Sequence, residues 1–195
     1  NDNSGSWRAC TASSITWEAG ISTNYKIELS TDNGSNWSIL NGNYPAVGST
    51  VTYSWAIGNT PSTQCRVRVT DFSNPTYTDM SDSAFTISPS IVVSYPNFGA
   101  ILQQGSTATI TWVNYNASNF YNIDYSTNGG STWTNIVTNY NTVTSNYAWT
   151  VPNLPSTNCL VRVTDFSSSC KSDVSDVPFE ITTTVPPITI TSPDG

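Results

Sequence analysis

The amino-acid sequence predicts an all-β protein made of two tandem antiparallel β-sandwiches. One observation is a long internal repeat: residues 61–73 read PSTQCRVRVTDFS and return as PSTNCLVRVTDFS at 155–167. A repeat of about 95 residues has the size of one small domain. A second observation is that apolar and polar residues alternate along many short segments, as they do in half-buried strands. The third is that aromatic residues make up 12% of the 195 residues, which supplies core material despite the polar composition.

The expected strands are short alternating segments separated by Gly, Asn and Pro clusters. In the first repeat they cover residues 14–17, 25–29, 51–55, 65–69 and 84–87. In the second repeat they cover residues 108–112, 121–125, 147–151, 159–163 and 178–181, preceded by an added strand at 91–94. Six or seven short strands per repeat, with turn signals at this spacing, indicate a sandwich of immunoglobulin or fibronectin type III shape.

Three pairs of tryptophans recur at matching repeat positions, and we expect them to pack the two cores: Trp17/Trp112, Trp37/Trp133 and Trp55/Trp149. The segment STDNGSNW at 30–37 predicts a hairpin with Gly in its turn. It resembles the Asp-box, S-x-D-x-G-x-x-W, in which the Asp satisfies turn amides and the Trp packs beneath. The second copy carries Asn128 at the Asp position, so a structural role is favoured over a required carboxylate.

The motifs ITW, YxIxxSTxxGxxW, PSTxCxVRVTDFS and DxSDxxFxI occur twice in the same order. Together they resemble tandem immunoglobulin-like modules of secreted, Bacteroidetes-type bacterial surface proteins, akin to the Ser-Thr-rich glycosylphosphatidylinositol-anchored family domain. The resemblance implies a secreted or cell-surface location. It also implies a non-catalytic role as a spacer, an adhesin stalk or a carbohydrate-associated module.

The two ends of the chain match each other in sequence. Residues 188–195, ITITSPDG, correspond to the strand that opens the second repeat, whereas the first repeat lacks an opening strand. We place one sandwich at 1–88, a second at 89–184, and a linker with the first strand of a following repeat, or a donor strand, at 185–195. The chain is then either an excerpt of a longer array or one period of a fibre. In the fibre, Ile188 and Ile190 would enter the core of the next copy.

Composition excludes several functions. A net charge of −7 with only six Lys and Arg argues against nucleic-acid binding. The absence of His removes Ser-His and Cys-His nucleophiles and any His-ligated metal, so we expect no enzyme activity and no cofactor. No apolar run reaches 18 residues, so we expect no membrane span. The expected partners are neighbouring repeats or copies of the chain, with carbohydrate as the alternative for an accessory module of a secreted hydrolase.

Two further kinds of site remain open at this stage. Repeated acids could hold calcium through loop carboxylates, although they could equally cap turns: Asp71, Asp79, Asp82, Asp165, Asp173 and Asp176. Aromatics that do not repeat could stack on a sugar, although they could equally pack against protein: Tyr115, Phe120, Tyr121 and Tyr140.

The cysteines fall into two classes. Cys65 and Cys159 share one repeat position and should point into each core, where a lone Cys acts as a small hydrophobe. Cys10 and Cys170 have no repeat counterparts, and we expect a disulfide between them. The alternative is a Cys10–Cys65 bridge inside the first sandwich.

Overall fold

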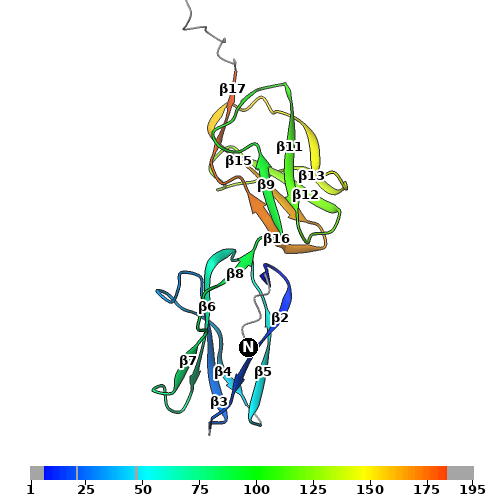
Figure 1. The fold of residues 1–195 in the computed structure, drawn as a ribbon. Helices are drawn as coiled ribbons and strands as arrows, with labels where there is room; N and C mark the ends of the chain where they lie inside the picture. The colour runs from blue at the N-terminus through cyan, green and yellow to red at the C-terminus, as the bar shows by residue number, and fades with distance from the viewer. Residues whose placement is uncertain (1–6, 21, 47, 184–195) are drawn as a thin grey trace, which may run out of the picture. The chain divides into compact units, whose positions relative to one another are not determined.

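The computed structural model describes residues 7–20, 22–46 and 48–183, and every regular element within them is a β-strand. The chain divides into two compact units, with the boundary between Ser90 and Ile91 (Figure 1). Each unit is a β-sandwich of the immunoglobulin/fibronectin type III kind, as the sequence predicts. Along the described stretches, no helix has the length and apolarity needed to cross a membrane.

Unit 2 has two sheets that face each other across one core. The smaller sheet has the order β14-β11-β9 and consists of β9 (Ile91–Tyr95), β11 (Thr107–Asn114) and β14 (Asn146–Thr150). The larger has the order β10-β17-β15-β12-β13, with β16 beside β15; its strands are β10 (Ile101–Gln103), β12 (Phe120–Ser126), β13 (Thr134–Asn141), β15 (Ser156–Asp165), β16 (Ser168–Val174) and β17 (Phe179–Thr182). The chain therefore passes from one sheet to the other between β9 and β10.

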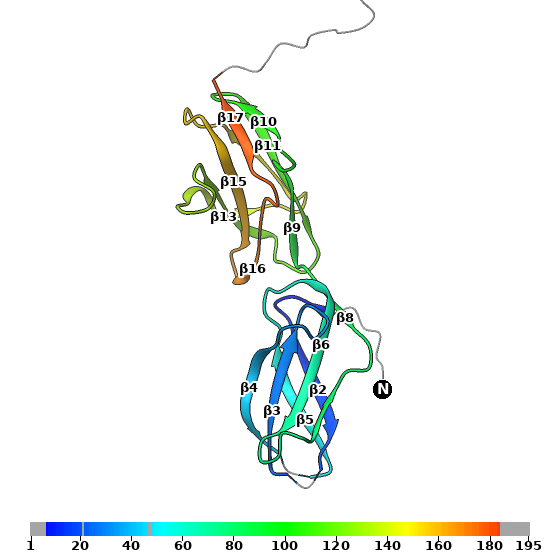
Figure 2. The ribbon, with the colours of Figure 1, turned by 90° about the vertical axis from the view of Figure 1, so that its left-hand side faces the viewer.

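Unit 1 repeats the larger sheet but has a narrower second sheet. The order β1-β8-β6-β3-β4, with β7 beside β6, is built from β1 (Trp7–Arg8), β3 (Asn24–Ser30), β4 (Ser38–Pro45), β6 (Ser62–Asp71), β7 (Thr78–Met80) and β8 (Phe85–Ser88). The second sheet pairs only β2 (Ala12–Glu18) with β5 (Thr50–Ala56). Among the described residues, unit 1 therefore has no counterpart of β9, whereas Figures 1 and 2 both show β9 beside β11 in unit 2.

The predicted core residues lie inside, but the two units bury them to different degrees. In unit 2, Trp112, Trp149 and Phe179 are at most 4% exposed. In unit 1 Trp55 is 2% exposed, whereas Trp17 and Phe85 are only partly buried and pack at the margin of the core. The same residue types thus have different environments in the two copies.

One prediction about the tryptophans is wrong. Trp37 and Trp133 do not join either core, and instead each lies under a guanidinium group on the outer face of the larger sheet. The Arg68 guanidinium carbon is 4.1 Å from the Trp37 ring centre, and that of Arg162 is 4.4 Å from Trp133. Because the guanidinium covers the ring, each indole is shielded without entering the core.

The cysteines separate as predicted. Cys10 and Cys170 are the disulfide-bonded cysteines, and Cys65 and Cys159 are free and fully buried. The alternative bridge between Cys10 and Cys65 is therefore wrong. Burial raises the pKa of the Cys65 and Cys159 thiols, so both stay protonated and act as small apolar side chains.

Replacing Trp55 or Trp149 by Ala should lower the free energy of unfolding by about 3–5 kcal/mol, because each change leaves a cavity in a closed core. Chemical denaturation followed by circular dichroism measures this loss. The matched control is Trp37→Ala, which removes only a cation–π contact on the outer face and should cost about 1 kcal/mol. Equal losses for Trp37→Ala and Trp55→Ala would contradict the assignment of the core.

The Asp32 hairpin makes a second prediction. Hydrogen bonds from the Asn36 side chain and backbone, and from Ser30, lower the Asp32 pKa from 3.8 to about 2. Because the folded-state pKa is depressed, the stabilisation is complete above about pH 4 and is lost as the pH falls towards 2. In unit 2 Asn128 accepts from Ser126 and from the Thr132 N–H, and its amide donates to the Thr132 hydroxyl. Asp32→Asn should therefore fold normally at neutral pH.

Acid titration of both proteins, followed by fluorescence, checks this prediction. The wild type should lose more stability than Asp32→Asn between pH 4 and 2. Identical acid profiles would show that the folded-state bonds to Asp32 do not lower its pKa.

Candidate functional site: an open groove in the first sandwich

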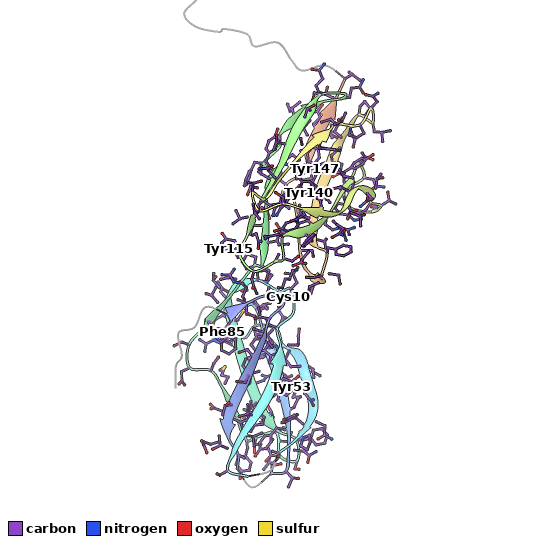
Figure 3. The ribbon with its side chains drawn as sticks, turned by 90° about the vertical axis from the view of Figure 1, so that its right-hand side faces the viewer. Cys10, Tyr53, Phe85, Tyr115, Tyr140 and Tyr147 are labelled. Carbon is purple, nitrogen blue, oxygen red and sulfur yellow. The ribbon has the colours of Figure 1, made fainter. Side chains whose placement is uncertain are left out.

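Unit 1 contains a groove of about 1160 Å³ that runs between β2 on one side and β7 with the start of β8 on the other. Its floor is apolar and aromatic, with Trp17, Tyr25, Val67, Val69 and Phe85. Its wall on the β2 side is formed by residues 13–18, the outer edge of the two-stranded sheet. Phe85, labelled in Figure 3, is the first residue of β8 and lines the groove.

The equivalent residues in unit 2 show what this groove would otherwise contain. In unit 2, at most 4% of the surface of Trp112, Val163 or Phe179 is exposed. Their counterparts in unit 1, Trp17, Val69 and Phe85, remain partly exposed. In unit 2 strand β9 occupies this place, where Ile91 and Val93 are each 1% exposed. Among the described residues, the groove of unit 1 therefore lies at the place that β9 occupies in unit 2, and its floor residues are less covered than their counterparts.

The pairing of β9 defines the geometry of a filled seat. Strand β9 runs antiparallel to β11, with Ile91 opposite Asn114, Val92 opposite Val113 and Val93 opposite Trp112. On its other side, the backbone N–H of Val93 donates to a carboxylate oxygen of Asp173 at 2.7 Å. Both edges of the inserted strand are thus engaged.

The turn after β9 is held by side chains in the gap between β16 and β17. The Ser175 hydroxyl donates to the Pro96 carbonyl oxygen at 2.9 Å, and it also accepts from the Val161 N–H. The Asn97 amide donates to Asp176 at 3.0 Å, while its oxygen accepts from the Val177 N–H at 3.0 Å. These bonds anchor the place where the chain crosses between the sheets.

Unit 1 carries the same three side chains that bond to β9 and its turn in unit 2. Asp79, Ser81 and Asp82 stand at the positions of Asp173, Ser175 and Asp176, and all three line the groove. Ser81 already accepts from the Val67 N–H at 3.3 Å, as Ser175 does from Val161. The side chains that would bond to an added strand are therefore already in place in unit 1.

Burial differs between the paired acids. Asp173 is partly buried beside β9, and this burial raises the pKa of its carboxyl, while the Val93 N–H bond opposes the rise. Asp79, at the matching position, is exposed. The carboxylate that contacts β9 is thus less exposed than its counterpart in unit 1.

The six acids proposed for calcium occupy two kinds of place. Asp71 accepts from the backbone N–H groups of Ser73 and Asn74, and Asp165 accepts from Ser118 and Ser167. The other four belong to the strand seats just described. Across residues 7–20, 22–46 and 48–183, no group of three or more acidic, Cys or His side chains is placed to hold a metal ion. The turn-capping alternative describes Asp71 and Asp165.

The four aromatics proposed for a sugar do not share one surface. Tyr121 is completely buried against Trp112, with ring centres 4.8 Å apart, so it is unavailable to a surface ligand. Tyr140 packs edge-on against Tyr147 at 5.0 Å (Figure 3). Tyr115 and Phe120 are exposed, at 54% and 42%. The proposed assembly residues Ile188 and Ile190 lie outside the described residues.

The sequence predicts only part of this groove. The missing opening strand of the first repeat predicts an unpaired edge, but the groove-lining residues Tyr77 and Met80 follow no strong pattern. Both are exposed, at 63% and 50%.

Comparison with known proteins gives similarity at the level of solved structures. No protein-family model matches the chain, and no curated protein matches it. The crystal structure of chicken CNTN1 FN1–FN3 domains matches with 15% identity and a TM-score of 0.32, covering 89% of this chain and 62% of that one. Structures of Clostridium thermocellum CbhA fibronectin(III)-like modules match with 12% identity and a TM-score of 0.30, covering 92% of this chain and 90% of that one. This chain thus spans less than two thirds of the CNTN1 fragment.

Proposed function

We propose that this protein is a non-catalytic structural or adhesive module of a secreted or cell-surface stalk or fibre, in which an added β-strand completes unit 1. The observation that carries the proposal is the groove over Trp17, Val69 and Phe85, at the place that β9 fills in unit 2. The partners are then neighbouring repeats or copies of the chain.

An added strand satisfies two needs of unit 1 together. The outer edge of β2 presents backbone groups that no described strand pairs with, and the floor of the groove exposes core side chains. A strand of alternating residues bonds to the edge with its backbone and covers the floor with every second side chain. An unpaired edge over an open core otherwise invites non-specific association, so a matching partner strand is favoured.

The receiving groups support a peptide strand over a sugar. Asp79 and Ser81 are positioned as their counterparts Asp173 and Ser175 are, and those counterparts bond to a backbone N–H and a backbone carbonyl. A sugar ring would use the aromatic floor but would leave the edge of β2 unpaired. The site therefore favours an extended peptide.

The disulfide supports the expected location. Disulfides persist in oxidising compartments such as the cell exterior, and Cys10 and Cys170 are disulfide-bonded. Two lysines in 195 residues and a net charge of −7 are compatible with such a surface protein.

A graft tests whether unit 1 accepts a strand. The variant carries a second copy of the sequence IVVSYPN, from residues 91–97, ahead of Asn1 through a short Gly-Ser linker. If the groove is a strand seat, the graft should raise the free energy of unfolding of unit 1 by about 2 kcal/mol or more, since two apolar side chains become buried. It should also protect the β2 amides from hydrogen exchange.

The matched control has Asp in place of the second Val of the graft, the residue copied from Val93, and should give neither effect because it places a charge on the apolar floor. Equal stability of the grafted, control and original chains would contradict the proposal. So would protection of the β2 amides by oligosaccharides in place of the graft.

A further inference from the structure

We infer that the occupant of the groove is residues 188–194 of a second copy of this chain, bound in the register that residues 91–97 adopt in unit 2. The inference rests on the proposed function, because it names the strand that the groove accepts. The pairing of β9 in unit 2 and the sequence of residues 188–194 support it.

The segment has the pattern that the seat requires. Aligned with IVVSYPN at 91–97, residues 188–194 read ITITSPD. Ile188 and Ile190 stand at the positions of Ile91 and Val93, the two side chains of β9 that are 1% exposed. Thr189 falls at Val92, on the face that points away from the core.

The pairing of β9 with β11 in unit 2 gives the expected pairing of residues 188–194 with β2 in unit 1. Because Val92 lies opposite Val113 and Val93 opposite Trp112, the matching pairs are Thr189 opposite Glu18 and Ile190 opposite Trp17. Ile190 then covers the partly exposed Trp17 ring. The outward pair, Thr189 with Glu18, remains in water.

The turn residues also correspond. Pro193 stands at Pro96, so the Ser81 hydroxyl is placed to donate to the carbonyl of residue 193 as Ser175 does to that of Pro96. Asp194 stands at Asn97, and its oxygen can accept from the Ser83 N–H as Asn97 does from Val177. One difference weakens the fit, because Asn97 donates an amide hydrogen to Asp176 whereas Asp194 would face the Asp82 carboxylate.

The donor and the acceptor lie on different parts of one chain, so the contact is heterologous. In unit 2 the equivalent seat is already filled by β9. A contact between the groove of unit 1 and residues 188–194 of another copy is therefore head-to-tail, and such contacts extend into open chains unless the rotation closes a ring.

Site-specific cross-linking between two single-cysteine-addition variants tests both the occupant and its register. Chains with Thr189→Cys are mixed with chains with Glu18→Cys under oxidised glutathione, and the products are mapped by mass spectrometry. Directly opposite Cβ atoms lie about 5 Å apart, close to what a disulfide needs, whereas diagonal positions lie about 7–8 Å apart. The native free cysteines are fully buried and should not compete.

We expect a disulfide between the two kinds of chain for Thr189→Cys with Glu18→Cys, and at least ten-fold less product for the matched control, Thr191→Cys with Glu18→Cys. Equal yields from the two mixtures would overturn the register. If neither mixture gives a product but the IVVSYPN graft stabilises unit 1, residues 188–194 are not the strand that binds the groove, while the proposed function stands. If the graft also fails, the proposed function fails with it.

Assembly of the full chain provides a second measurement. Ile190→Asp should abolish concentration-dependent association in sedimentation velocity, while Thr191→Asp, at the position of the exposed Ser94, should preserve it. Asp194→Asn restores the amide donor towards Asp82 and should tighten association about ten-fold. Association that is unchanged by Ile190→Asp would overturn the inference.

Discussion

The burial of each core depends on the gap between the two sheets, which we call the seam. It lies between β2 and the strands β7 and β8 in unit 1, and between β11 and the strands β16 and β17 in unit 2. In unit 2 a single five-residue strand, β9, closes this seam and brings Trp112, Val163 and Phe179 to near-complete burial. In unit 1 the seam is open, and their counterparts stay partly exposed. Apolar burial is the dominant favourable term in folding, so this one strand separates a complete core from an incomplete one.

The two repeats act as internal controls for each other. Ser81 and Ser175 have the same sequence context and accept the same kind of backbone bond, from Val67 and Val161. Only Ser175 also donates to a crossing chain, through the carbonyl of Pro96. The difference between the units therefore lies in the presence of the strand and not in the residues that receive it.

Several of the polar side chains stabilise turns. Asp71 and Asp165 accept backbone N–H groups from residues that follow their strands, and Asp32 and Asn128 organise the two hairpins. Short polar side chains stabilise turns by bonding to nearby backbone groups. A chain rich in Ser, Thr and Asn can thus build many tight turns with few charges.

Arginine and tryptophan form a second layer outside the cores. Arg68 stacks on Trp37 and also bonds to Glu28, which is 5% exposed, and Arg162 stacks on Trp133 and bonds to Asp124. The planar guanidinium can stack and pair at the same time, which an ammonium cannot do. This arrangement covers apolar rings on the outer face of each larger sheet.

Repetition and period-two alternation in the sequence determined the two sandwiches, their main strands and the residues that face each core. They could not reveal β4 and β13, whose pairings with β3 and β12 contain register shifts that interrupt the alternation. Nor could they separate Trp37 from Trp55, since a Trp covered by Arg68 and a core Trp look alike in sequence. The tertiary structure decided these points and the shape of the open seat, because burial depends on which strands meet across the sandwich and not on neighbours along the chain.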